Sequence, residues 1–293
     1  MDINITCMKC MLNKIEKLYD KYNGNQNNKM EFMQKAYNIC SHFDKKDTAP
    51  ELSRQLMNLF GEKDLYYNEK KYSNDKMMCI REEIENKIKT SKDSLYNALK
   101  YAMIGNFIDF GAMDEVDDSV LDEILNKVDL IDIDKDYYKL FSNDLSNAKK
   151  IVYLTDNAGE LVCDYLFLNE IRNKYNNLEI EIILRGAPIF NDATIEDAEL
   201  IGLTKEYKCF HNGINMPGNQ LDKIDKEALY KIKNADLIIS KGQGNFESLA
   251  GCGENIYYVF LCKCNLFVDR FGLNLYDGVF INEKYLNKKI INK

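Results

Sequence analysis

The sequence contains no tryptophan, and only 3 prolines and 2 histidines, in 293 residues. It also lacks any run of about 18 apolar residues, which argues against a membrane-spanning helix. The two histidines, His42 and His211, are far apart in the chain, and a lone histidine is more often a surface or core residue than a metal ligand. These absences argue against a membrane protein and against a zinc site built on histidine.

Positive charge is also scarce. The 39 lysines and arginines are outnumbered by 47 aspartates and glutamates, which gives a net charge of −8. No basic patch is visible, so nucleic acid is not an expected partner. The N-terminus lacks the basic and apolar segments of a secretory signal, and the 9 cysteines are odd in number and scattered. We therefore expect a cytoplasmic protein with reduced thiols.

The first half of the chain has the periodicity of α-helices. Apolar residues recur at helical spacing, as in Leu12, Ile15 and Leu18. The segment from Thr48 to Glu51 has the features of a helix start, with a threonine cap, a proline near the first turn and a glutamate three residues after the cap. We expect residues 1–149 to form an all-helical domain.

The second half alternates short β-branched runs with helical stretches, which is typical of βαβ units. Because these runs are apolar on both faces, we expect parallel strands buried between two helical layers. Residues 150–293 are therefore predicted to form a Rossmann-like α/β domain with five or six strands. The candidate strands are residues 151–154, 180–184, 207–210, 236–240, 256–261 and 278–281.

Polar side chains follow several of these strands, at the edge where an open α/β sheet binds its ligands. Acids and amides follow the first and second strands, and a lysine with a further amide ends the fourth. We expect these groups to converge on one edge of the sheet. They are Asp156, Asn157, Glu160, Asn191, Asp192, Lys241 and Asn245.

Three of these residues, Asp156, Asn157 and Asp192, offer hard oxygen ligands for a divalent ion such as Mg²⁺, Mn²⁺, Co²⁺ or Ni²⁺. A helix expected to begin near Ala158 would direct free N–H groups toward the same edge, where they favour an anion such as phosphate. Lys241 would neutralise another phosphate oxygen. A metal ion that polarises a phosphoryl group and activates a bound water is suited to phosphate-ester hydrolysis.

The residues after the first strand and those after the second strand also have a simpler interpretation. Asp156 and Asn157, followed by Ala158 and Gly159, are ordinary residues of a turn that leads into a helix. Asn191 to Thr194 is similarly explained as a loop before a helix that Thr194 caps and that runs to about Leu200. The coincidence of polar residues at the ends of successive strands favours the functional interpretation.

Three longer motifs contain these residues, namely LTDNAGE at 154–160, RGAPIFNDAT at 185–194 and ADLIISKGQGNFESL at 235–249. Together they resemble the damage-control phosphatase family, long catalogued as domain of unknown function eighty-nine. The resemblance extends to IGNFIDFG at 104–111 and to Cys7-Met-Lys-Cys10, which is typical of the prokaryotic branch. It implies a helical N-terminal domain over a Rossmann-like domain, and metal-dependent hydrolysis of small phosphorylated metabolites.

The resemblance also implies roles for individual residues. Asp156, Asn157 and Asp192 match the family's metal ligands, and Lys241 matches a lysine that contacts the substrate phosphate. Asn106 and Asp109 belong to a segment that approaches the same cleft from the helical domain. Glu160 and Asn245 are further candidates for substrate binding. The motifs do not specify the substrate.

Other functions remain open from the residues alone. The same edge would serve a non-catalytic sensor of a phosphorylated metabolite or metal. A methyltransferase that uses S-adenosylmethionine is less consistent with the sequence, since Asp156-Asn157 replaces the usual glycine-rich turn. A nicotinamide cofactor is not expected, because the glycine motif after the fourth strand lacks its third glycine.

The cysteines leave one further alternative. Cys7 with Cys10 and Cys262 with Cys264 form two closely spaced pairs. Four thiolates would bind zinc if the fold brought them together, whereas cysteines three residues apart in a helix are often simply buried.

Overall fold

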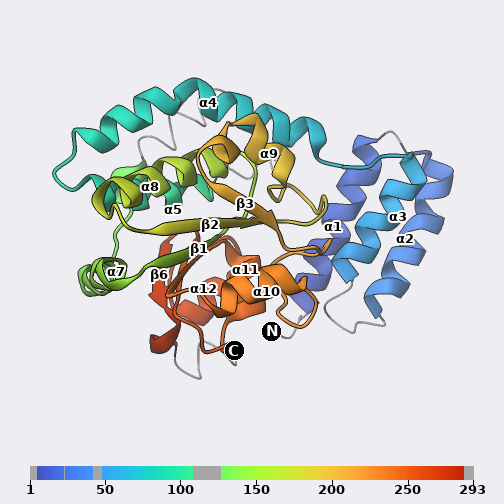
Figure 1. The fold of residues 1–293 in the computed structure, drawn as a ribbon. Coiled ribbons are helices and arrows are strands. Elements are labelled where there is room, and N and C mark those ends of the chain that lie inside the picture. Colours follow the sequence, from blue (N-terminus) through green and yellow to red (C-terminus); the bar gives the residue numbers. More distant parts are fainter. Residues whose placement is uncertain (1–4, 23, 42–47, 108–126, 287–293) are drawn as a thin grey trace.

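The computed structural model describes residues 5–22, 24–41, 48–107 and 127–286 (Figure 1). Asp109 lies outside these ranges. The first half is helical, as predicted. Its elements are α1 (Ile5–Lys21), α2 (Gln26–Ser41), α3 (Thr48–Phe60), α4 (Tyr67–Lys89), α5 (Ser94–Gly105), a short 3₁₀ turn (Val128–Leu130) and α7 (Lys135–Asn147). The helix predicted to start at Thr48 is α3.

The second half alternates strands and helices, and each of the six predicted runs forms a strand. The strands are β1 (Lys150–Leu154), β2 (Glu179–Leu184), β3 (Lys208–His211), β4 (Leu237–Lys241), β5 (Ile256–Leu261) and β6 (Gly278–Asn282). The helices between them are α8 (Glu160–Lys174), α9 (Ile195–Leu200), α10 (Lys226–Lys233), α11 (Gln243–Leu249) and α12 (Asn265–Phe271). The mixed α/β fold expected from the sequence is confirmed.

The strands form one sheet in the order β3-β2-β1-β4-β5-β6. Strands β1 to β5 run parallel to one another, and β6 is antiparallel to β5. This order is that of a doubly wound sheet, in which the chain moves outward from β1 in one direction and from β4 in the other. The parallel sheet predicted from the sequence is thus correct except for its edge strand β6.

Helices cover both faces of the sheet (Figure 1). Alternate residues of β1 show this, because Ile151 and Tyr153 belong to one apolar cluster, whereas Val152 and Leu154 belong to the other. The first cluster includes side chains from α4, α5, α7, α8 and α9. The second includes side chains from α10, α11 and α12. Burial on both faces explains the almost continuous apolar character of the strands.

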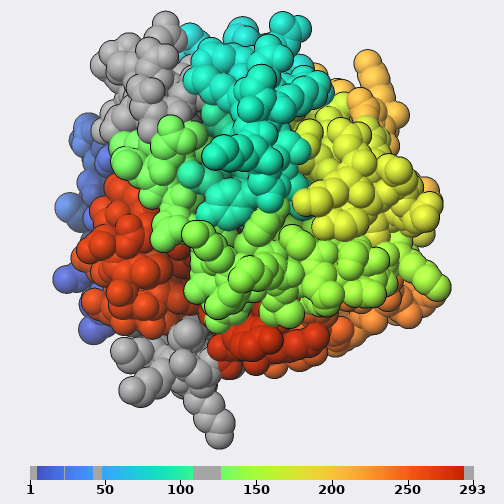
Figure 2. Space-filling model, turned by 90° about the vertical axis from the view of Figure 1, so that its left-hand side faces the viewer, coloured from blue at the N-terminus to red at the C-terminus, as the bar shows by residue number. Residues whose placement is uncertain are grey.

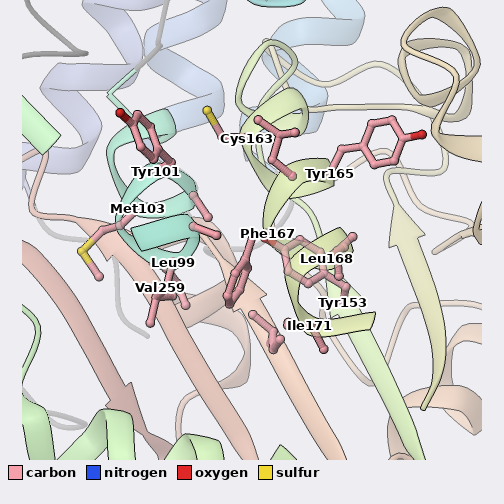
Figure 3. Packing of buried hydrophobic residues seen from close by; sticks show 14 of the residues in the cluster. Leu99, Tyr101, Met103, Tyr153, Cys163, Tyr165, Phe167, Leu168, Ile171 and Val259 are labelled. Atoms are coloured by element: carbon pink, nitrogen blue, oxygen red, sulfur yellow. The ribbon is translucent and has the colours of Figure 1, made fainter. Parts of the chain in front are cut away.

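Helix α8 packs against both α4 and α5, and α5 also contacts β5 directly. Every residue from Glu160 to Leu168 is buried, which leaves this part of the helix without a solvent-exposed face. In Figure 3, Leu99 of α5, Phe167 of α8 and Val259 of β5 point into the same packed region. The close packing of α5 on α8 brings the helical half of the sequence directly over the ends of β1 and β4.

The hydrophobic cores do not divide the chain at residue 149, where the domain boundary was predicted. Helices α4, α5 and α7 share a core with the sheet, because their apolar faces cover a surface that α8 and α9 leave open. Figure 2 shows the same mixing at the surface, where residues of the α7 region, in green, lie against residues near the C-terminal end of the sequence, in red. The separate core belongs to the three-helix bundle of α1, α2 and α3 (residues 5–60), with Leu65 and Tyr66.

None of the helices in the described ranges is long and apolar enough to cross a bilayer. The longest, α4, has 23 residues, and many of them are charged.

Removing the Leu99 side chain should test how strongly the two halves stabilise each other. Leu99 is fully buried between α5 and the sheet. Leu99→Ala should lower the free energy of unfolding by about 2–5 kcal/mol, the range for a large apolar side chain replaced by a cavity. Leu130→Ala is the control, because Leu130 is 79% exposed, and it should change stability by less than about 0.5 kcal/mol. Denaturant unfolding measures both, and equal losses would contradict the packing described.

Candidate active site

The site lies where the direction of the chain across the sheet reverses. Strands β1 and β4 are neighbours, yet β1 leads through α8 to β2 on one side and β4 leads through α11 to β5 on the other. Two connections that diverge in this way leave a crevice at the carboxyl ends of the strands. Asp156 follows β1 at this crevice, and Gly242 follows β4.

The loops after β1 and β2 are joined by their backbones. Asn157 and Asp192 form an isolated antiparallel bridge. The N–H of Ala158 donates to the carbonyl of Asn191 at 2.9 Å, and the N–H of Ala193 donates to the carbonyl of Asp156 at 2.7 Å. The structure therefore places the predicted ligands Asp156, Asn157 and Asp192 side by side.

The Asp156 carboxylate is held by two amides. Nδ2 of Asn106 and Nδ2 of Asn157 each donate to its Oδ2 at 3.0 Å. Asn157 Nδ2 also donates to Glu160 at 3.1 Å. Because both contacts use the nitrogen end of the Asn157 amide, its oxygen is directed away from these carboxylates.

Arg185 holds the second carboxylate and was not among the predicted site residues. Its Nε donates to Asp192 Oδ2 at 2.6 Å, and its Nη2 lies 3.7 Å from Asp156 Oδ1. The side chain is fully buried, and within the described residues Nη1 and Nη2 make no hydrogen bond. A lone arginine at the end of a buried apolar strand was the signal available in the sequence, since such a charge requires an acidic partner.

Lys241 lies behind these acids, in a fully buried ion cluster. Its Nζ donates to Glu160 Oε1 and Asp164 Oδ1, both at 2.6 Å, and to the carbonyl of Ala102 at 2.7 Å. An ammonium group has three N–H donors, so all of them are occupied. In this structure Lys241 compensates buried acids, and the predicted contact with a phosphate would require the cluster to open. Asp164 was also missed, although it lies one helical turn after Glu160.

Asn106 connects the helical half to the site, as the family resemblance implied. It is fully buried at the end of α5, where Nδ2 donates to Asp156 at 3.0 Å and to Glu160 at 2.9 Å. Its Oδ1 accepts the N–H of Leu261 in β5. Asn106 therefore orients two acids at once.

Asn245 lies in the first turn of α11, where its side chain is fully buried and bonded to other groups of the protein. Its Nδ2 donates to the carbonyls of Thr155 and Lys241, and its Oδ1 accepts from Asn219. These contacts join the loops after β1 and β4. The geometry gives Asn245 a structural function in this conformation.

The expectation of free N–H groups near Ala158 was wrong for the first two residues. Ala158 donates to Asn191, and Gly159 donates at 2.7 Å to Oδ1 of Asn74 in α4. Asn74 also donates to Asp197, which completes the capping box of α9 with Thr194. The predicted helix start at Thr194 is confirmed, and these backbone groups serve to fix the two loops.

Gly242 allows the Asp156 carboxylate to approach the backbone after β4. Its φ is +79°, and a Cβ at this position would lie 2.0 Å from Asp156 Oδ2. Any side chain here would displace the carboxylate.

Burial and mutual repulsion dominate the electrostatics of the acids. Burial, followed by the charges of Asp192 and Glu160, raises the pKa of Asp156 to about 8, although Lys263 and Arg185 oppose the shift. Burial likewise raises the pKa of Asp164 to about 7, with Lys241 opposing it. Negative charge is thus only partly compensated here, which favours a bound cation.

A pocket of about 150 Å³ opens onto the predicted ligands. A larger hollow of about 600 Å³ beside β3 contains no predicted site residue. The smaller pocket is lined by Lys14, Asn106, Asp156, Asn157, Phe190, Asn191, Asp192, Pro217, Gln243, Gly244 and Lys263.

Within the described ranges, no three side chains of histidine, cysteine, aspartate or glutamate are arranged to hold a metal ion together. The zinc alternative from Cys7, Cys10, Cys262 and Cys264 therefore gains no support. His211 is largely exposed at the end of β3, 3.6 Å from Asp225.

The oxygen ligands offered by two carboxylates and the Asn157 amide match the preference of Mg²⁺ and Mn²⁺, which complete their coordination shells with water.

Comparisons with known proteins show a similarity that extends over most of the chain. Residues 3–279 match the Damage-control phosphatase ARMT1-like domain. A damage-control phosphatase of Pyrococcus horikoshii is 30% identical over 272 residues, covering 90% of this chain and 92% of the relative. One from Archaeoglobus fulgidus is 30% identical over 240 residues, covering 79% of this chain and 80% of the relative. The crystal structure of a DUF89 family protein from P. horikoshii superposes with a TM-score of 0.85 at 26% identity, covering 97% and 99% of the two chains.

The raised pKa of Asp156 predicts a pH-dependent stability of the metal-free protein. A folded-state pKa above the unfolded value means that the folded protein binds the proton more tightly, so stability is lost as pH rises from about 4 to about 8. Asp156→Asn should lack this loss. From pH 5 to pH 8, the unfolding free energy of Asp156→Asn relative to that of the wild type should increase by more than about 1.4 kcal/mol, which corresponds to one pKa unit.

Denaturant unfolding in the presence of a chelator measures this difference. The exposed Asp132→Asn provides the control, since its difference from the wild type should be constant over the same pH range. A constant difference for Asp156→Asn as well would contradict the shift.

Proposed function

The chain belongs to the damage-control phosphatase ARMT1-like domain family, and we propose that it hydrolyses phosphomonoesters of small metabolites in a metal-dependent reaction. The observation that carries this proposal is the convergence of two carboxylates and one amide, from the ends of two adjacent strands, on a single pocket. Such oxygen ligands suit a hard divalent cation.

Asp156, Asn157 and Asp192 would hold the ion, with Mn²⁺ or Mg²⁺ as the first candidates and Co²⁺ or Ni²⁺ as alternatives. When bound, such an ion polarises the phosphoryl group and lowers the pKa of a water molecule. The uncompensated negative charge around Asp156 supports the assignment, since a cation would relieve the repulsion among these acids.

Arg185 and Asn106 orient the two carboxylates from the protein side. Arg185 contacts both Asp192 and Asp156, and Asn106 donates to Asp156. Fixed ligands of this kind lower the reorganisation needed during the reaction. We therefore assign both residues a positioning function.

Lys263 is the lysine that the geometry favours for the phosphate. It lines the pocket, and its charge lowers the pKa of Asp156. Lys241, the lysine implied by the family resemblance, is enclosed by Glu160 and Asp164. Its contact with phosphate remains a prediction, and its charge in the present conformation stabilises the two acids beneath the site.

The pocket supports small substrates. A cavity of about 150 Å³ accommodates a benzene-sized molecule, so a phosphate ester with a short carbon chain fits the volume observed here. Surplus or damaged phosphorylated metabolites are the substrate class we propose.

Turnover is favoured over a sensor function, because two relatives are named as phosphatases.

Removal of the proposed ligands should abolish hydrolysis. We expect purified protein to hydrolyse an aryl phosphate with Mn²⁺. Asp156→Asn and Asp192→Asn should each lower kcat by at least about 100-fold, since each removes a ligand of the ion that stabilises the transition state. Excess chelator should have the same effect on the wild type, and added Mn²⁺ should reverse it.

Two measurements separate a lost ligand from a lost fold. Mn²⁺ should raise the Tm of the wild type and of the exposed control Asp132→Asn, but not that of Asp156→Asn or Asp192→Asn. Phosphate release that persists unchanged in both variants would refute the assignment. Tight binding of phosphorylated compounds without release would instead indicate the sensor.

A further inference from the structure

Lys14 lines the pocket although it belongs to α1, far from the strand-end motifs in the sequence. It lies in the three-helix bundle that has its own core. No strand-end motif indicates it, because it enters the site only through the packing of α1 beside the loop after β2.

The contact that places Lys14 is with Phe190, two residues before the proposed ligand Asp192. The Lys14 ammonium lies 4.6 Å from the centroid of the Phe190 ring. Phe190 packs against the bundle core, has its ring edge-on to Tyr66 and adopts a positive φ of 48°. This backbone conformation is uncommon for a bulky residue and is maintained by its surroundings. The bundle is thereby connected to the loop that carries Asp192.

Lys14 differs from other lysines of the bundle in its electrostatic partners. Lys29 pairs with Glu16 and Asp20, and Lys21 pairs with Glu69. Within the described residues Lys14 makes no ion pair, and its partner is the face of an aromatic ring. A ring face orients an ammonium group but leaves its charge available to an anion.

The pocket therefore has lysines with different surroundings. Lys263 acts on Asp156, next to the proposed metal ligands. Lys14 lies over Phe190, at the side formed by the bundle. A phosphoryl group bound through an ion held by Asp156 and Asp192 would leave Lys14 to the remainder of a short substrate.

We propose that Lys14 determines specificity by binding a second anionic group of the substrate, so that the enzyme prefers short phosphate esters that also carry a carboxylate or a second phosphate. The inference rests on the proposed function for the position of the phosphoryl group. Among the described residues, the other side chains around the pocket are acids, amides, Phe190 and Pro217, so Lys14 and Lys263 provide the positive charge of this lining.

Two matched probes test this preference without any turnover. Propylphosphonate and 3-phosphonopropionate carry the same phosphonate on a three-carbon chain, and only the second has a terminal carboxylate. Titration calorimetry with the full chain and Mn²⁺ should show about tenfold or tighter binding of the carboxylated probe, as expected for a hydrogen bond between charged groups. Methylenebisphosphonate, tested in parallel, reports whether a second phosphonate replaces the carboxylate.

Variants then assign the preference to one side chain. Lys14→Met should bind the two three-carbon probes with equal affinity, because it loses affinity for the carboxylated probe alone. Lys14→Arg should restore most of the preference for the carboxylated probe. Lys263→Met should lower the binding affinity for both probes by a similar factor. Lys9→Met removes the same charge from an exposed position of α1 outside the pocket and should leave both affinities unchanged.

The outcomes separate this inference from the proposed function. Equal binding of the two three-carbon probes by the wild type, or a preference that persists in Lys14→Met, would overturn the assignment of Lys14 even if aryl phosphate is hydrolysed. If the affinities follow the expected pattern but no divalent metal ion supports hydrolysis, Lys14 is supported as an anion-binding residue and the phosphatase mechanism is contradicted.

Discussion

The structure depends on the balance of charge buried at the ends of β1 and β4. Four buried carboxylates lie there, with Arg185 and Lys241 as the fully buried cations among the described residues; the acids are Asp156, Glu160, Asp164 and Asp192. Removing such charges from water is costly unless each charge is paired. If one partner of a buried pair is removed, the remaining charge keeps its full desolvation penalty. The excess of acids is the physical reason why we propose a divalent cation at this point.

The fold holds these charges with groups from distant parts of the chain. Asn106 at the end of α5 and Asn74 in α4 supply amides to Asp156 and to the backbone of Gly159. Lys14 reaches the pocket from the bundle. The helices of the first half are therefore components of the site, and α4 and α5 share a core with the sheet instead of forming a separate domain.

The sequence predicted the strands, the helical first half and the convergence of Asp156, Asn157 and Asp192, because these follow from local periodicity and from the rule for strand ends. It did not predict the surroundings of Lys241 or the contribution of Arg185. A lysine after a strand looks the same whether it faces the ligand or the core. Only the position of α8, which brings two acids to Lys241, decides between them.

The sequence by itself determined which residues follow which strands, since alternation, β-branching and turn residues act over a few positions of the chain. Tertiary structure alone decided that β6 runs antiparallel, that the N–H of Gly159 is occupied by Asn74, and that Lys14 lies at the pocket. Each of these depends on the packing of segments separated by many residues. Such contacts arise from the shape and charge of the assembled core, which no local pattern encodes.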